Sequence, residues 1–108
     1  PTLDGHLESV FADLADDASP EDVAAAMREY PGVDLPSAPE QLIHVFEDEF
    51  RPQPRLDRDR GDGMQISAGG IQSTEHGVKY NCLAHNTIRG AAGASVLNGE
   101  LLAQEGWI

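Results

Sequence analysis

Residues 82–95 read Cys-Leu-Ala-His-Asn-Thr-Ile-Arg-Gly-Ala-Ala-Gly-Ala-Ser, and this stretch decides the fold of the C-terminal part of the chain. It predicts the end of a buried strand, then a capped turn, then a helix whose first two turns carry little side-chain bulk. Asn86 or Thr87 is predicted to cap the helix, because short polar side chains accept from the free N–H groups of a first turn. The glycines and alanines of 90–94 either expose the helix N-terminus to a polar or anionic ligand, or permit close packing.

The elements that flank this stretch follow from apolar periodicity. The helix is expected from about residue 87 to residue 105, with Gly106 as its left-handed stop and Trp107 folding back on the last turn. Alternating apolar residues predict strands over 64–68 and 78–84, joined as an antiparallel hairpin. The other predicted elements are a strand over 2–14 covered on both faces, a helix that starts at Ser19-Pro20 and stops at Pro31-Gly32, an irregular connection over 33–40, a short strand over 42–46 and a loop over 47–63.

Three blocks of the sequence carry a family resemblance. Residues 3–10 read LDGHLESV, residues 51–59 read RPQPRLDRD, and HNTIRGAAG over 85–93 is followed by the helical run ASVLNGELLAQEGW. The blocks occur in order and extend over essentially the whole chain. They resemble the C-terminal part of aspartate-semialdehyde dehydrogenases of the archaeal and fungal type.

The resemblance implies an α+β fold with a mostly antiparallel sheet packed with helices. By this resemblance, residues 1–108 correspond to part of the C-terminal catalytic and dimerisation domain of the glyceraldehyde-3-phosphate dehydrogenase-like type. This part ends in the helix that returns to the NADP domain. With 108 residues the chain has room for one modest domain. The only G-x-G, Gly61-Asp62-Gly63, is followed by Met-Gln-Ile and fails the G-x-G-x-x-G pattern. We therefore expect a C-terminal piece of a larger enzyme, without its Rossmann domain.

The parent enzyme implied by the resemblance converts L-4-aspartyl phosphate and NADPH to L-aspartate 4-semialdehyde, NADP and phosphate. This step belongs to lysine, threonine and methionine biosynthesis, and the enzyme acts as a homo-oligomer, a dimer or a tetramer. The family's nucleophilic cysteine and its substrate-binding arginine lie upstream of the matched region, so the 108-residue chain alone is expected to be inactive. Alternatives are a related acyl-CoA or acyl-phosphate reductase of the malonyl-CoA reductase type, and a non-catalytic dimerisation fragment.

His6 is the candidate catalytic residue. By resemblance, the histidine of the DGHxE block is the acid/base that deprotonates the nucleophilic thiol and assists transfer to phosphate. Glu8 lies two residues on, hence on the same face of a strand, where a carboxylate can fix a histidine tautomer and tune its pKa. From spacing alone, a structural or merely exposed histidine is the preferred interpretation, and the catalytic role comes from the resemblance.

Asn86, Thr87 and Gly90 are the candidate NADP-binding residues. In the resembled family an amide at the position of Asn86 touches the nicotinamide end of NADP. An amide side chain offers a donor and an acceptor, which matches a carboxamide. A plain helix cap remains compatible with the same residue, and Thr87 and Gly90 would line the same approach.

Cys82, the only cysteine, falls on the apolar side of a predicted strand and is interpreted as a small hydrophobe rather than a nucleophile. No metal site is expected, because the four histidines show no ligand-type spacing with it. Arg55 and Arg58 could steer phosphate, but ion pairs within the loop to Asp57 and Asp59 are the preferred interpretation.

The composition is strongly acidic, with 19 Asp and Glu, seven Lys and Arg, and a formal charge of −12. Such charge repels itself at low ionic strength, and the single lysine favours a halophilic source over an ordinary acidic domain. It argues against nucleic acid or anionic membranes as partners. We see no membrane-spanning run or signal peptide, and a lone cysteine suits a reducing, cytoplasmic location.

Overall fold

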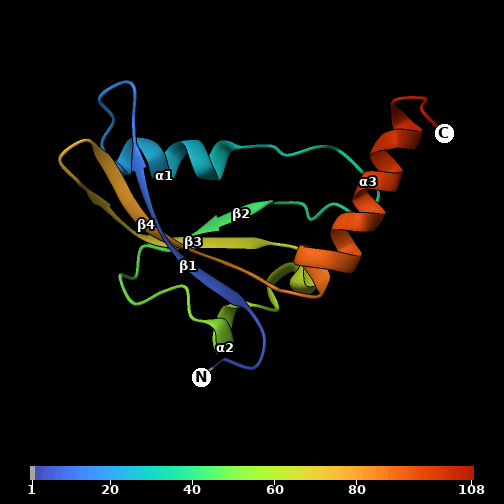
Figure 1. The fold of residues 1–108 in the computed structure, drawn as a ribbon, viewed down its shortest axis with the longest axis horizontal. Helices are drawn as coiled ribbons and strands as arrows, with labels where there is room; N and C mark the ends of the chain where they lie inside the picture. Colours follow the sequence, from blue (N-terminus) through green and yellow to red (C-terminus); the bar gives the residue numbers. More distant parts are fainter. Residues whose placement is uncertain (1) are drawn as a thin grey trace.

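A computed structural model describes residues 2–108 as one four-stranded sheet with helices beside it (Figure 1). The strand order is β1-β4-β3-β2; β4 pairs antiparallel with both β1 and β3, and β2 pairs parallel with β3. The strands are β1 (His6–Asp13), β2 (Ile43–Val45), β3 (Ile66–Ser73) and β4 (Gly77–Ala84), and the helices are α1 (Pro20–Glu29), α2 (Pro54–Asp57) and α3 (Gly93–Gln104). The expected α+β class with a mostly antiparallel sheet is confirmed.

Helix α1 begins as its sequence predicts. The Ser19 hydroxyl accepts from the N–H of Asp22 at 3.1 Å, and the Asp22 carboxylate accepts from the N–H of Ser19 at 2.9 Å. This reciprocal capping box satisfies two backbone donors, and Pro20 is preorganised for the first helical position. The helix ends at Glu29, before Pro31, and it packs over β2 and β3.

The hairpin of β3 and β4 forms the centre of the sheet. Thr74 N–H donates to the carbonyl of Gly77 at 2.8 Å across its turn, and the register shifts between Gly69 and Gln72. Met64 lies before β3 rather than in it, so the predicted strand starts too early. The hydrophobic core is small and consists of Leu35, Val45, Ala68, Val78 and Leu83.

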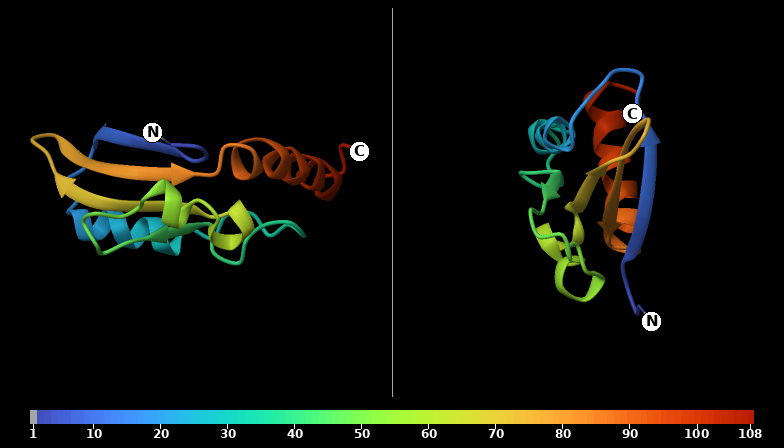
Figure 2. Two further views of the ribbon diagram at one scale, coloured as in Figure 1. Left: turned by 90° about the horizontal axis from the view of Figure 1, so that it is seen from below. Right: turned by 90° about the vertical axis from the view of Figure 1, so that its left-hand side faces the viewer.

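Strand β1 is an edge strand, and the expectation that both of its faces are covered is wrong for the described residues. It pairs only with β4, and Leu7 and Phe11 are 48% and 73% exposed. The reason is that α1 packs over β2 and β3, on the opposite side of the molecule from β1 (Figure 2). The face of β1 with Leu7 and Phe11 therefore lies at the surface of this chain, whereas Val10 and Ala12 on the other face are half-buried.

The segment 47–63 is not the plain loop that its sequence predicts, because it contains the short helix α2 and a 3₁₀ turn over Arg60–Gly63. The segment is dense in proline and charged residues, and it has no periodic pattern of apolar residues from which these turns could be predicted. None of the helices described over residues 2–108 combines the length and the apolarity that crossing a bilayer requires.

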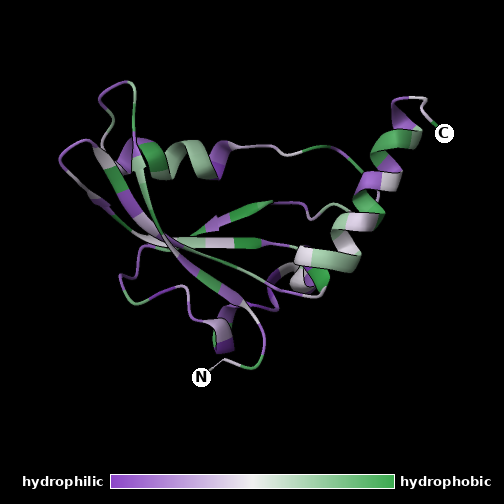
Figure 3. Cartoon of the chain, viewed as in Figure 1, coloured by the Kyte–Doolittle hydropathy of each residue, from purple (hydrophilic) through white to green (hydrophobic). Residues whose placement is uncertain are grey.

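The C-terminal helix starts with a π-helical turn over Ile88–Ala92, which leads into α3. At its end, Gly106 adopts φ +74°, and the N–H of Trp107 donates to the carbonyl of Leu102 at 2.8 Å, so the predicted stop is confirmed as a Schellman motif. The Trp107 side chain is 78% exposed, however, and does not cover the last turn. Apolar residues lie along the whole of α3, none of them buried (Figure 3).

Candidate functional site

The three blocks of sequence that carry the resemblance meet around Gly5. The N–H of Gly5 donates to Oδ1 of Asn86 at 2.7 Å. Gly5 has φ +102°, and a Cβ atom there would lie 3.2 Å from both Leu83 Cδ1 and Pro54 Cβ. Only glycine suits this backbone conformation and this close approach. The segments 3–10, 51–59 and 85–93 are therefore held together at one point, although they are far apart in sequence.

His6 follows Gly5 and is the first residue of β1, where it pairs with Ala84. Its side chain is exposed, and Glu8 lies on the same face of the strand. No hydrogen bond or ion pair joins His6 to Glu8 among residues 2–108, so the hypothesis that Glu8 fixes the histidine tautomer has no direct contact to support it. His6 is accessible to groups from outside the chain.

Thr87 occupies the N-cap position of the π-helical turn, but its side chain forms no capping bond, and neither does that of Asn86; the side chain of His85 accepts from the first N–H groups instead, so the predicted capping by Asn86 or Thr87 is wrong. Nδ1 of His85 accepts from the N–H groups of Thr87 and Ile88 at 3.3 and 3.4 Å. Because Nδ1 is the acceptor, the neutral ring carries its proton on Nε2, which lies 3.7 Å from Oδ1 of Asp59. Asn86 is not free to cap the turn, since its oxygen is engaged by Gly5.

The small residues of the C-terminal turn serve close packing at Gly93. A Cβ atom at Gly93 would overlap the side chain of Met64, and one at Gly63 would lie 2.9 Å from Ile88 Cδ1. This supports the packing interpretation for Gly93. Gly90 differs, because it is exposed and would meet only the carbonyl of His85, at 3.2 Å. The surface at Gly90 and the equally exposed Thr87 is therefore open to a ligand.

The segment 51–59 is held by an ion pair between the half-buried Arg51 and the buried Asp57. Arg51 donates through Nε at 2.7 Å and through Nη2 to the carboxylate of Asp57, which also accepts from the N–H of Gln53 at 2.7 Å. Burial alone would raise the pKa of Asp57, but the bonds from Arg51 and Gln53 outweigh it and lower the pKa.

The expected pairing within this segment is thus only partly right. Arg58 does pair with Asp59, at 3.5 Å, but the partner of Asp57 is Arg51 rather than Arg55 or Arg58. Arg55 forms no ion pair within the described part of the chain. The local helix α2 brings Asp57 back over Arg51, and the sequence pattern does not reveal this turn.

Cys82 lies in β4 opposite Ala68 and Glu8. Burial, followed by the charge of Glu8, raises the pKa of its thiol. Because the thiolate is the reactive form, these surroundings favour a structural role. Residues 2–108 contain no group of three or more His, Cys, Asp or Glu side chains arranged to hold a metal ion.

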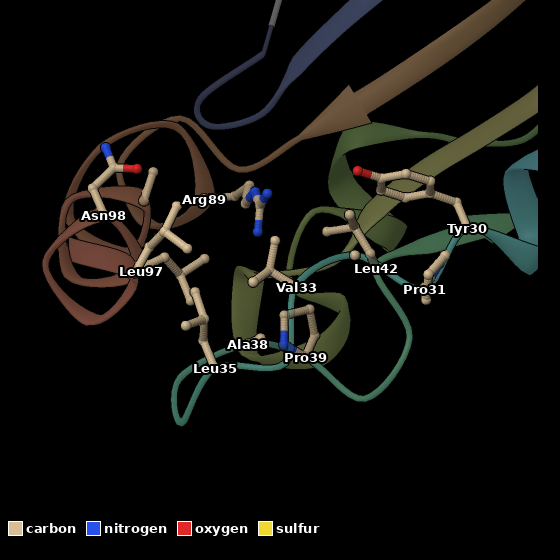
Figure 4. A pocket seen from close by; sticks show the side chains of 13 residues that line it. Tyr30, Pro31, Val33, Leu35, Ala38, Pro39, Leu42, Arg89, Leu97 and Asn98 are labelled. Atoms are coloured by element: carbon tan, nitrogen blue, oxygen red, sulfur yellow. The ribbon is translucent and has the colours of Figure 1, made fainter. Parts of the chain in front are cut away.

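A cavity of about 200 Å³ lies between α3 and the irregular connection before β2 (Figure 4). Its walls are mainly apolar, with Leu35, Leu42 and Leu97 among them, and the side chain of Arg89 reaches into it. Ser37 anchors the connection by donating to Glu100 of α3 through its N–H at 3.0 Å and its hydroxyl at 2.6 Å.

No sequence pattern singles out Gly5, His85 or Arg89 as functional residues. Gly5 stands beside the candidate histidine but carries no signal of its own, because its partners Pro54, Leu83 and Asn86 are distant in sequence. Gly5 lies in the DGH block and His85 in the HNT block. The resemblance therefore identifies the right segments but does not predict the contacts between them.

Comparison with known proteins agrees with this arrangement. Residues 1–89 match the model of the family described as "Semialdehyde dehydrogenase, dimerisation domain". An aspartate-semialdehyde dehydrogenase from Archaeoglobus fulgidus is 50% identical over 106 residues, which are 97% of this chain and 31% of that protein. A malonyl-CoA reductase (NADP) from Metallosphaera sedula is 36% identical over 99% of this chain and 32% of its own length.

A solved structure is also similar. The crystal structure of aspartate-semialdehyde dehydrogenase with NADP from Candida albicans superposes with a TM-score of 0.86 and 43% identity, over all of this chain and 32% of that one. The chain thus spans about a third of the length of the relatives that it matches. The expected resemblance is confirmed: this chain belongs to the semialdehyde dehydrogenase dimerisation-domain family.

Proposed function

We propose that the chain is the C-terminal part of an NADP-dependent aspartate-semialdehyde dehydrogenase, which converts L-4-aspartyl phosphate and NADPH to L-aspartate 4-semialdehyde, NADP and phosphate. The observation that carries the proposal is the junction at Gly5. There the histidine-bearing segment is joined to the turn with Asn86 by a 2.7 Å hydrogen bond, beside Pro54. Similarity to the Archaeoglobus and Candida enzymes over nearly the whole chain supports the same conclusion.

His6 is the proposed acid/base of this reaction. A neutral imidazole can take a proton from a thiol and return it to a leaving group, which positioned side chains do efficiently near neutral pH. The exposure of His6 supports this role, because the nucleophilic cysteine is supplied by the rest of the enzyme and must reach it. The raised pKa of Cys82 makes the cysteine of this chain unsuited to that task.

Asn86, Thr87 and Gly90 are the proposed contacts of NADP in this chain. Bound NADPH would supply the hydride that reduces the acyl carbon. The donor set fits the carboxamide of nicotinamide: the NH₂ group of Asn86 has no partner among residues 2–108, and Thr87 is exposed, with its hydroxyl 3.4 Å from Nδ1 of His85. Gly90 leaves room for close approach to the backbone of the turn.

The remaining surfaces suggest two interfaces in the complete enzyme. Helix α3 exposes Val96 and Leu102, at 52% and 43%, and we propose that it packs against the NADP-binding domain. Strand β1, with exposed Leu7 and Phe11, lies in the region that matches a dimerisation domain, so we propose that the enzyme is a homo-oligomer, a dimer or a tetramer. Exposed apolar side chains that share one face of a strand or helix support such interfaces.

The biological setting is inferred from chemistry and charge. Aspartate semialdehyde formation would place the enzyme in lysine, threonine and methionine biosynthesis in the cytoplasm. The charge of −12 with a single lysine supports a halophilic source, because high salt screens such repulsion.

A related malonyl-CoA reductase is the second candidate, since such an enzyme is 36% identical to this chain. Assay of the complete enzyme separates the two. Phosphate-dependent NADP reduction with aspartate semialdehyde is expected, whereas NADPH oxidation with malonyl-CoA and none with aspartyl phosphate would favour the reductase. The 108-residue chain alone should be inactive in both assays. If the complete enzyme is inactive with both substrates but self-associates, the chain is a non-catalytic dimerisation module.

A further inference from the structure

The hydrogen bond between Gly5 and Asn86 lies directly beyond the end of the β1–β4 ladder. The last paired residues are His6 and Ala84, after which β4 turns into the π-helical segment. The N–H of Gly5 therefore has no backbone acceptor on β4 to continue the ladder. Oδ1 of Asn86 occupies that place at 2.7 Å, across 81 residues of sequence.

This contact fixes which way the Asn86 amide faces. The N–H of Gly5 can only donate, so the oxygen of Asn86 must face it and the NH₂ group must point elsewhere. The Asn86 side chain thus binds the histidine segment through its oxygen, and the two N–H groups of its amide remain available to another partner. A helix cap would not require this orientation, and the cap is in any case made by His85.

The placement of His6 depends on its backbone. Its side chain forms no hydrogen bond within residues 2–108, so no neighbour of the imidazole holds it. Gly5, directly before it, is confined by Leu83 and Pro54 on one side and by Asn86 through its N–H. Loss of the Asn86 oxygen would free Gly5 to shift, and His6 would shift with it.

Resting on the proposed role of His6, we propose that Asn86 is a positioning residue, whose oxygen holds Gly5 and thereby sets the position of the His6 imidazole. A displacement of about 1 Å at a reacting group can cost up to a hundredfold in rate. The effect should therefore appear in kcat rather than only in cofactor binding.

The test uses the complete enzyme with Asn86→Ala and Asn86→Asp. Aspartate keeps an oxygen for Gly5 and loses the NH₂ donors, whereas alanine loses both. We expect Asn86→Ala to lower kcat by about tenfold or more, and Asn86→Asp, which keeps the oxygen, to recover part of that loss, with kcat at least about threefold above that of Asn86→Ala. Both should raise KM for NADP. If Asn86→Ala folds poorly, Asn86→Ser replaces it as the variant without an oxygen in reach of Gly5.

Asn81→Ala is the matched control. Asn81 also joins β4 to β1 through its side-chain oxygen, which accepts from the Ser9 hydroxyl at 2.7 Å, but it lies away from His6. Its kcat should stay near that of the unaltered enzyme. Hydrogen–deuterium exchange of the peptide covering residues 2–10 provides a readout independent of activity: one further amide should exchange rapidly in Asn86→Ala, and not in Asn86→Asp.

Equal losses of kcat in Asn86→Ala and Asn86→Asp would overturn the inference, as would an equal loss in Asn81→Ala. A normal kcat in Asn86→Ala together with a slow His6→Ala enzyme would reject the positioning role alone. A normal kcat in His6→Ala would reject the proposed acid/base, and the positioning role with it.

Discussion

Asp57 is 1% exposed, and its carboxylate is held by the guanidinium of Arg51 on one side and the N–H of Gln53 on the other. This pair holds the segment whose Pro54 packs against Gly5. Asp57→Asn removes the carboxylate and leaves the Arg51 guanidinium, 27% exposed, without its partner, so the fold should lose about 2 kcal/mol of stability at about pH 7. Urea unfolding followed by circular dichroism measures the loss.

The pH dependence of that loss follows from the lowered pKa of Asp57. A carboxyl whose pKa is depressed by folding contributes stability above its unfolded value, about 3.9, and loses it as the pH falls through the folded value. The difference between Asp57→Asn and the unaltered chain should therefore shrink below about pH 4. Glu47→Gln is the control, because Glu47 is 93% exposed in its 3.8 Å pair with Arg28; a change of less than about 1 kcal/mol is expected. An equal loss of stability in both variants would contradict the conclusion that the Arg51–Asp57 pair holds this segment.

His6→Ala in the complete enzyme should lower kcat by about a hundredfold or more, the usual scale for a positioned acid/base. Steady-state NADP reduction with aspartate semialdehyde and phosphate measures it. His76→Ala serves as the control, because His76 lies exposed in the β3–β4 turn beside Glu75. A near-normal rate in His6→Ala would remove the histidine from the mechanism.

Cys82→Ala should leave kcat nearly unchanged, because burial and the charge of Glu8 raise the pKa of the thiol and keep it protonated. Iodoacetamide should accordingly modify Cys82 more slowly in the folded protein at about pH 8 than in urea, and the difference should narrow as the pH rises. Loss of activity in a well-folded Cys82→Ala enzyme would show that the structural interpretation is wrong.

Two glycines at the C-terminal helix should respond to alanine in opposite directions. Gly93→Ala would displace the end of the Met64 side chain and place the new methyl group 3.0 Å from the backbone carbonyl of Ile88, which cannot easily move, so it should lower the melting temperature of the 108-residue chain. Gly99, inside α3, has open space where the methyl group of an alanine would lie, with nothing within 4 Å. Gly99→Ala should therefore stabilise the chain by about 0.5–1 kcal/mol through helix propensity. Thermal unfolding in molar KCl compares the two, and stabilisation by both would contradict the Gly93–Met64 contact.

Salt should strengthen the fold of the chain. With a net charge of −12, carboxylates repel one another in dilute buffer, and at molar salt the screening length falls to about 3 Å. Circular dichroism should therefore show a gain of helix and of cooperative melting between low and molar KCl. Equal melting temperatures at both salt concentrations would reject the halophilic source while leaving the family assignment intact.

Local signals predict local structure well in this chain. The cap of α1 needs only Ser19 and Asp22, three residues apart, and the stop of α3 needs only Gly106, so both are visible in the sequence. The cap of the C-terminal turn is mispredicted because Gly5, 81 residues away, engages the side chain of Asn86 and leaves the capping to His85.

The limits of prediction at the candidate site have the same origin. His6 and Asn86 can be named from the resemblance, whereas the contact that joins their segments depends on the register of β1 against β4. Apolar residues on both faces of β1 predict that both faces are covered, but no described element covers the face with Leu7 and Phe11, which are exposed. That pattern reflects an environment larger than the chain itself.

The pairing of β1 with β4 bears on how the protein is made. A ribosome releases the N-terminal end first, and β1 must wait unpaired until the β3–β4 hairpin, whose strands are close in sequence, has emerged. Gly5 gains its partner only when Asn86 has left the ribosome as well. The histidine segment therefore stays without this partner while the 81 residues up to Asn86 are added, and the candidate site cannot form before they have emerged.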